Sequence, residues 1–320
     1  MKLMISGCVA AMLALVQPAL AQDFPSRPIT LVVPYAAGGG VDATARLVGE
    51  RLGEALGQPV IAQNRPGAST VIGAEAVARA EPDGYTLLLV PSTHVVNTSF
   101  VKKLPFDPIE DFTPITIFAS LSMALVAGSE QPFDNLRDVV SYARAHPGQL
   151  SIGSSDSLTV LAGEMLKSMA DLDIEQVNYR GGAPTAADVM GGHIPLGVLT
   201  SISTTPLYKA KSLKVLGVTG PRRTAAMPDV PTIAEAAGLP DYDIQVWYVL
   251  LGPAGLPKPV VERLHSEMEK IMEEPEMQTR LAGLGIDPIL GVTPDQAEKI
   301  MKSDMRRWDK IIKAAGIQPQ

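Results

Sequence analysis

Cysteine and aromatic residues are scarce in this chain. Its single cysteine is Cys8, and Phe, Trp and Tyr together make up 5% of the 320 residues. Residues 1–21 contain one lysine, an apolar stretch and a final Ala19-Leu20-Ala21, the small-residue pattern at which signal peptidase cleaves. Cleavage is therefore predicted after Ala21. It would remove Cys8 and leave an exported chain without disulfide or thiol chemistry.

Two other interpretations of this leader, a lipoprotein signal and a membrane anchor, are less favoured by the sequence. Residues 5–8 superficially resemble a lipoprotein cleavage box, but the apolar region follows Cys8 instead of preceding it, which argues against lipidation. The apolar stretch at residues 4–16 is shorter than the roughly 20 residues that a membrane-spanning helix needs. The leader is thus predicted to be a signal peptide, and the protein to be periplasmic.

Runs of basic residues and catalytic motifs are absent from the sequence. The 27 Lys and Arg residues are outnumbered by 34 Asp and Glu, for a formal net charge of −7, so we expect no nucleic-acid partner. Ser157 stands where a nucleophile elbow requires glycine, and the four histidines are widely spaced. We therefore expect no metal, no cofactor and no enzymatic activity.

Apolar runs and helical patterns alternate along the chain, and 46% of the residues are hydrophobic, enough for two cores. Such alternation is typical of parallel sheets with crossover helices. Strands are predicted at 29–34, 60–63, 86–90, 150–153, 174–178, 194–199 and 213–219, and helices at 41–56, 72–80, 134–147, 158–170, 184–190, 259–273 and 294–315.

Long apolar segments at 115–127 and 244–251 separate the two sets of strands and helices. Two extended crossings of this kind would hinge two lobes. The predicted fold is therefore α/β, with each lobe a mostly parallel sheet flanked by helices. Lobe 1 is assigned residues 22–122 and 248–320, and lobe 2 residues 123–247.

A glycine-rich loop follows the first predicted strand and opens directly into a helix. Gly38, Gly39 and Gly40 have no side chains to block the unpaired N–H groups of a helix start, which favours binding of a carboxylate or phosphate. The spacing also fits a dinucleotide-binding turn, but the second strand ends in Gln63-Asn64 without an acidic residue for a ribose. A tight turn without any ligand is the remaining alternative.

A second loop of this type, at residues 153–157, joins a strand to a helix in the other predicted lobe. Its hydroxyl groups and backbone donors lie where a helix dipole is positive, so the two loops could hold the two ends of one ligand. The alternative is simple capping of the helix by Ser155 or Asp156. An ionised Asp156 would oppose a second carboxylate unless it turns away to cap the helix.

Further polar loops lie at the ends of predicted strands, where open α/β sheets bind ligands. Residues 64–70 and 91–94 belong to lobe 1, and residues 178–184 to lobe 2. Arg180 could bind a carboxylate through two hydrogen bonds, or pair with a neighbouring acidic side chain. His94 is the one histidine near the predicted cleft.

An ordered set of motifs gives the mature chain a resemblance to a known family. The motifs are Val33-Pro34-Tyr35 with Ala37-Gly38-Gly39 and Asp42, Asn64-Arg65-Pro66-Gly67-Ala68, Pro82-Asp83-Gly84-Tyr85, Tyr179-Arg180-Gly181-Gly182-Ala183-Pro184 and Pro228-Asp229-Val230-Pro231-Thr232. With them the chain resembles the Bug family, the TctC-like extracytoplasmic solute receptors of tripartite tricarboxylate transporters.

The resemblance implies a two-lobed periplasmic-binding fold of type II that closes around a small carboxylate and delivers it to the transporter's membrane components. It also implies contacts from the loop at residues 35–42 and from the Gly/Ser loop of lobe 2. We expect a monomer. The predicted ligand-binding residues are Tyr35, Ala37, Gly38, Gly39, Asp42, Asn64, Ser92, Thr93, Ser154, Ser155, Asp156, Thr159, Tyr179, Arg180, Thr200 and Ser201.

This chain departs from the family pattern in lobe 2. Asp156, Leu158 and Thr159 follow the Gly/Ser loop where glycine, serine and histidine are common, and Leu199-Thr200-Ser201 replaces a frequent Phe-Asp pair. The identity of the ligand therefore does not carry over. Two alternatives to transport also stay open: a sensor that presents its closed form to a signalling receptor, and a periplasmic enzyme with His94 or Asp42 as base.

Overall fold

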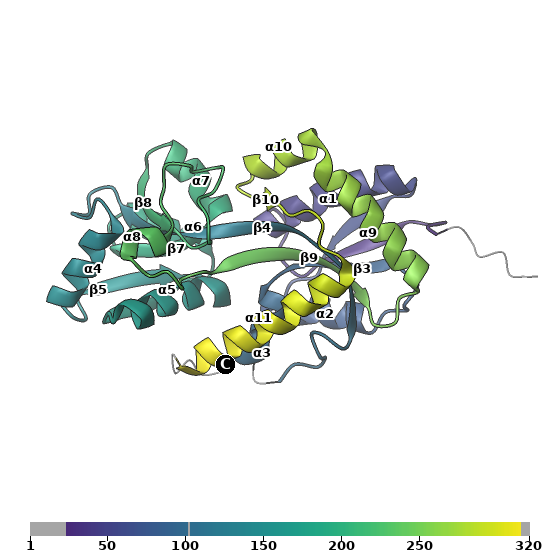
Figure 1. Ribbon diagram of the computed structural model, residues 1–320, viewed down its shortest axis with the longest axis horizontal. Helices are drawn as coiled ribbons and strands as arrows, with labels where there is room; N and C mark the ends of the chain where they lie inside the picture. Colours follow the sequence, from purple (N-terminus) through teal and green to yellow (C-terminus); the bar gives the residue numbers. More distant parts are fainter. Residues whose placement is uncertain (1–23, 102, 315–320) are drawn as a thin grey trace, which may run out of the picture.

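Two groups of strands and helices are joined by two long strands (Figure 1). The computed structural model describes residues 24–101 and 103–314, so the predicted signal peptide lies outside the described residues. The strands are β1 (Ile29–Val33), β2 (Val60–Asn64), β3 (Thr86–Pro91), β4 (Phe112–Gly128), β5 (Leu150–Ser154), β6 (Ile174–Asn178), β7 (Leu196–Thr200), β8 (Leu213–Val218), β9 (Gln245–Pro253) and β10 (Asp287–Pro288).

Helices cover the strands of both groups. They are α1 (Gly40–Leu56), α2 (Val71–Ala78), α3 (Thr93–Phe100), α4 (Leu136–Ala145), α5 (Ser157–Ala170), α6 (Gly182–Met190), α7 (Ser201–Lys209), α8 (Ile233–Ala237), α9 (Lys258–Glu273), α10 (Pro275–Gly283) and α11 (Pro294–Ala314), with a 3₁₀ turn η1 (Ala68–Thr70) before α2. In the described residues, no helix has both the length and the apolarity to span a membrane.

The sheet is continuous and mixed, in the order β2-β1-β3-β9-β4-β7-β5-β6, with β8 and β10 also paired to β4. The outer pairs are parallel: β1 with β2 and β3, and β5 with β6 and β7. The two long strands instead run antiparallel to their neighbours. The predicted α/β fold is confirmed, with parallel pairing confined to the outer strands because the crossing segments join the sheet in the opposite direction.

Strand β4 changes partners along its length. From Phe112 to Ser122 it pairs with β9, whereas from Met123 to Gly128 it pairs with β7 and β8. This exchange supports the predicted division into lobe 1 (22–122 and 248–320) and lobe 2 (123–247), which stays a prediction.

Local sequence patterns account for most of the helices. In α1, Ala45, Val48 and Leu52 are fully buried on one face, and Gly57 ends the helix in the left-handed conformation (φ +70°) that glycine adopts without strain. A capping box precedes α11, since Thr293 and Gln296 exchange side-chain and backbone hydrogen bonds. The short helices α3, α7, α8 and α10 were not predicted.

Helix α11 fixes α3 in place. It packs against α3 and β4, and α3 in turn contacts α5 of the other predicted lobe (Figure 1). The indole N–H of Trp247 on β9 donates to Asp304 Oδ2 of α11 at 2.6 Å. The C-terminal helix thereby ties one wall of the space between the lobes to a crossing strand.

Candidate functional site

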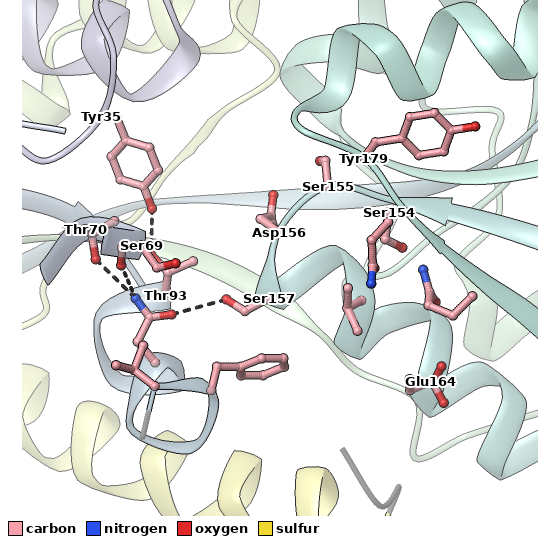
Figure 2. A pocket seen from close by; sticks show the side chains of 16 residues that line it. Tyr35, Ser69, Thr70, Thr93, Ser154, Ser155, Asp156, Ser157, Glu164 and Tyr179 are labelled. Carbon is pink, nitrogen blue, oxygen red and sulfur yellow. Dashed lines mark hydrogen bonds between the residues drawn. The ribbon is translucent and has the colours of Figure 1, made fainter. Parts of the chain in front are cut away.

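A cavity of about 600 Å³ lies where the starts of α2, α3 and α5 meet the ends of β1, β5 and β6 (Figure 2). Helix starts carry partial positive charge, so this convergence suits an anion. The lining residues are Tyr35, Ser69, Thr70, Thr93, Asn97, Phe100, Val101, Ser154, Ser155, Asp156, Ser157, Val160, Glu164, Gln176, Asn178 and Tyr179.

Six of the predicted ligand-binding residues line this cavity: Tyr35, Thr93, Ser154, Ser155, Asp156 and Tyr179. They come from both predicted lobes, and Figure 2 shows Tyr35 and Thr93 on one side facing Ser155 and Asp156 on the other. The remaining predicted residues are not among the lining residues: Ala37, Gly38, Gly39, Asp42, Asn64, Ser92, Thr159, Arg180, Thr200 and Ser201. Ligand contact stays a prediction for every residue of both groups.

Asp42 holds the glycine-rich loop in shape. Its Oδ2 accepts from the Gly38 N–H at 2.8 Å and from Arg46 Nε at 3.0 Å, while its Oδ1 accepts from Asn64 Nδ2 at 2.8 Å. Asn64 Nδ2 also donates to the carbonyl oxygen of Tyr35 at 3.1 Å. The hydrogen bond from Arg46 is the main cause that lowers the pKa of Asp42 to about 2. A carboxylate with these bonds positions the loop and is a poor general base.

The start of α1 has no side-chain cap. Gly39 is the N-cap residue, and no side chain of residues 24–101 or 103–314 caps it with a hydrogen bond. The glycines also permit a close approach of the other predicted lobe, since a Cβ atom on Gly40 would lie 2.5 Å from Ile202 Cδ1 of α7. Near this contact the Ser201 hydroxyl donates to the carbonyl oxygen of Gly285 at 2.6 Å. Thus α1 presents backbone donors that no described residue uses, beside a contact between the predicted lobes.

The start of α5 is capped by side chains. Asp156 Oδ1 accepts from the N–H groups of Leu158 and Thr159 at 3.0 and 2.9 Å. In return, Thr159 Oγ1 accepts from the N–H groups of Ser155 and Asp156 at 2.9 and 3.0 Å. The capping alternative for Asp156 is therefore observed. The backbone donors of this loop are used within it.

Asp156 nevertheless remains open to the cavity. Asp156 is an exposed residue that lines the cavity, and the partial loss of solvent around its carboxyl raises the pKa of that group. The capping hydrogen bonds from Thr159 and Leu158 lower the pKa in part. Burial raises the pKa of Tyr35, whose hydroxyl is paired with Thr93 Oγ1 at 2.8 Å, and the charge of Asp156 adds to this rise.

A strained turn forms part of the lobe 1 wall. Ala68, Ser69 and Thr70 have φ angles of +45°, +52° and +81°, which non-glycine residues rarely adopt. Asn97 holds this turn, with Nδ2 donating to the Ser69 carbonyl at 2.5 Å and to Thr70 Oγ1 at 3.1 Å. The hydroxyl of Ser157 on α5 reaches Asn97 Oδ1 at 3.4 Å and so links the two sides of the cavity.

These wall residues were not predicted individually. Ser69 and Thr70 belong to a loop that the sequence flagged only as polar, and Asn97 lies in the unpredicted helix α3. Gln176 and Asn178 carry a weak signal, since both stand near the end of predicted strand 174–178. Glu164 on α5 faces the cavity from a helix position that no local pattern distinguishes from solvent-exposed ones.

Tyr179 and Arg180 have different surroundings. The Tyr179 hydroxyl donates to Asp188 Oδ2 at 2.7 Å, which fixes the ring at the edge of the cavity. Arg180 is exposed. Thr200 lies beside Ser203, with 3.4 Å between their hydroxyl oxygens.

His94 belongs to the core of the first lobe. It is 2% exposed, stacks on Phe106 and meets Phe112 edge to face, and its Nε2 lies 3.0 Å from the carbonyl oxygen of Pro108. Burial lowers the pKa of the imidazole to about 4. The ring does not line the cavity, so this structure gives it no access to a ligand there.

Known proteins resemble this chain over most of its length. The family model described as "Tripartite tricarboxylate transporter family receptor" matches residues 44–317. A UPF0065 protein from the tcbD-tcbE intergenic region of Pseudomonas sp. strain P51 is 37% identical over 291 residues, which are 90% of this chain and 86% of the relative.

Solved structures share the fold at similar coverage. The structure of Rpa4515 from R. palustris with adipate has a TM-score of 0.84 and 33% identity, over 93% of this chain and all of that one. The periplasmic binding protein BugD has a TM-score of 0.81 and 29% identity, again over 93% of this chain and all of that one. These similarities favour solute binding over the sensing and enzymatic alternatives.

Proposed function

Since this chain belongs to the tripartite tricarboxylate transporter receptor family and is a periplasmic solute-binding receptor, we propose that it captures a small organic carboxylate between its two lobes. The loaded receptor then delivers the ligand to the membrane components of a tripartite transporter. It acts as a monomer without enzymatic turnover, after cleavage of the leader behind Ala21. The observation that carries the proposal is the cavity lined by residues of both predicted lobes, where Tyr35 belongs to the loop that leads into the uncapped start of α1.

The ligand's carboxylate binds the backbone N–H groups at the start of α1, directly or through bound water. The glycines leave these donors accessible, and Asp42 keeps the loop in position through Gly38. Tyr35 and Thr93 complete the lobe 1 side, and Ser154, Ser155 and Tyr179 the lobe 2 side. Closure of the lobes about β4 and β9 traps the ligand.

The first experiment is a thermal-shift screen of mono-, di- and tricarboxylates and amino acids on the purified exported protein. A ligand at 100 times its Kd stabilises the native state by about 2.7 kcal/mol, which such a screen detects readily. Calorimetry then compares the wild type with Gly39→Val. The ideal Cβ at Gly39 meets only the Ala36 carbonyl oxygen, at 3.6 Å, so valine fits the fold while its methyl groups screen the helix start.

Gly283→Val is the matched control, since a Cβ at Gly283 meets no described atom within 4 Å and α10 contributes no lining residue. We expect Gly39→Val to lose at least tenfold in affinity and Gly283→Val to bind as the wild type does. Unchanged affinity in a folded Gly39→Val protein would place the carboxylate site elsewhere.

A further inference from the structure

The helix starts α1 and α5, which belong to different predicted lobes, differ in what they offer a ligand. Gly39 and Gly40, at the start of α1, donate no backbone hydrogen bond to any residue that the structure describes. At the start of α5 the corresponding N–H groups are already bonded to Asp156 and Thr159. One side therefore offers hydrogen-bond donors to an anion, and the other does not.

The second side offers a carboxylate instead. The capping bonds of Asp156 all go to Oδ1, and no described residue donates to Oδ2. Figure 2 shows this side chain in the space between Tyr35 and Ser155. The hydroxyl and amide groups near it, on Tyr35, Thr93 and Asn97, are already paired with one another or with the strained turn.

The charged side chains that line the cavity, among the residues that the structure describes, are both acidic. Among the described residues that line it, Asp156 and Glu164 are acidic and none is Lys, Arg or His. Glu164 is neutralised by Lys167 Nζ at 2.8 Å, whereas Asp156 has no ion-pair partner within the described part of the chain. A partly desolvated carboxylate without a partner favours a cation from outside the protein.

We propose that Asp156 binds a positively charged nitrogen of the ligand, so that the receptor selects small amino carboxylates over dicarboxylates. This inference rests on the proposed function, because it places the ligand's carboxylate at the start of α1. The ammonium group donates to Asp156 Oδ2 in a charge-assisted hydrogen bond. A second carboxylate at that place would meet the negative charge of Asp156 and lose affinity.

The test compares three ligand types by calorimetry at pH 7: an ω-amino carboxylate, the dicarboxylate of matching length, and the monocarboxylate without a second polar group. One set is 6-aminohexanoate, adipate and hexanoate, and the shorter set is 4-aminobutanoate, succinate and butanoate. The proteins are the wild type and Asp156→Asn. Asparagine caps helices as well as aspartate does, so this variant keeps the start of α5 and loses only the charge.

Asp138→Asn is the matched control. Asp138 also accepts from two backbone N–H groups at a helix start, those of Asp134 and Asn135, but it lies on α4 and does not line the cavity. Both variants thus remove one capping charge from the same predicted lobe. A general effect of net charge on anion binding would appear in both.

We expect the wild type to bind the amino carboxylate of at least one set at least tenfold more tightly than the matching dicarboxylate. The ratio of the Kd for the dicarboxylate to the Kd for the amino carboxylate should fall at least tenfold in Asp156→Asn and stay unchanged in Asp138→Asn. Tighter binding of the dicarboxylate by the wild type, or an equal ratio in wild type and Asp156→Asn, would overturn the inference while leaving carboxylate capture intact. Failure of every ligand to bind the folded wild type would overturn the proposed function as well.

Discussion

A methyl group added at Gly40 should test whether the lobes close as the structure shows them. The Cβ of Gly40→Ala would lie 2.5 Å from Ile202 Cδ1 and 3.2 Å from Ile202 Cγ2. Ordinary van der Waals contact begins near 3.5 Å. Either the Ile202 side chain moves by about 1 Å or α1 and α7 separate.

The size of the effect follows from the cost of overpacking. Forcing a methyl group into a packed contact costs about 1–3 kcal/mol. Because Gly40 and Ile202 belong to different predicted lobes, this cost falls on the closed, ligand-bound form. At 1.4 kcal/mol per tenfold, affinity should fall by about 5- to 150-fold. The free energy of unfolding without ligand should change much less, since the ligand-free lobes are free to open.

Calorimetry with the tightest ligand from the screen measures the affinity, and urea unfolding without ligand measures the stability. Ile202→Ala is the rescuing change, and the double variant should recover at least half of the lost binding free energy. Wild-type affinity in Gly40→Ala would refute the reasoning about closure. A loss that Ile202→Ala does not relieve would show that the methyl group obstructs the ligand itself.

Three further predictions concern stability. Asp42→Ala should lower the free energy of unfolding in urea by about 1–3 kcal/mol, because three hydrogen bonds are lost. Since the pKa of Asp42 is lowered to about 2, its contribution to stability disappears only as pH falls from about 4 toward 2. The substitution should therefore lower the free energy of unfolding equally at pH 7 and pH 5. The free energy of unfolding of the wild type should fall by about 2 kcal/mol between pH 7.5 and pH 5, because unfolded histidine takes up a proton below about pH 6.5 while buried His94 does so only near pH 4. His94→Phe should remove this part of the pH dependence when both proteins are unfolded in urea over the same pH series. Trp247→Phe should lower the stability by about 1–3 kcal/mol by leaving the carboxylate of Asp304 without its indole donor, and an unchanged urea midpoint would mean that this bond contributes nothing net.

The main elements of the fold were accessible from local patterns. The predicted strands and long helices agree with the structure to within one to three residues at most ends, as for α1 and for β6 at Ile174–Asn178. Hydrophobic period and a terminating residue suffice for α1, because it has a buried stripe of Ala45, Val48 and Leu52 and ends at Gly57. Helices α3, α7, α8 and α10 were missed since they are short and start in polar segments that local rules assign to loops.

The candidate site was only partly accessible. Loops at strand ends gave Tyr35, Thr93 and the residues around Asp156, because parallel strands bring their carboxyl ends to one edge of a sheet. Asn97 and Glu164 became visible only in the structure, since their direction depends on how α3 and α5 pack. Arg180, which has the right chemistry for a carboxylate, is exposed and does not line the cavity.

The ordered motifs carried the resemblance to the family, and composition and local pattern alone determined the α/β class, the two groups of elements and the glycine-rich start of α1. Local chemistry is enough for these, because they depend on neighbours within a few residues. Tertiary structure decided that β4 pairs with β9 in its first part and with β7 and β8 in its second. Tertiary structure also decided that Asp156 caps α5 with one oxygen while its side chain stays open to the cavity. Local sequence does not show this, because the walls of the cavity come from segments more than 80 residues apart in the chain, such as those of Ser69 and Ser155.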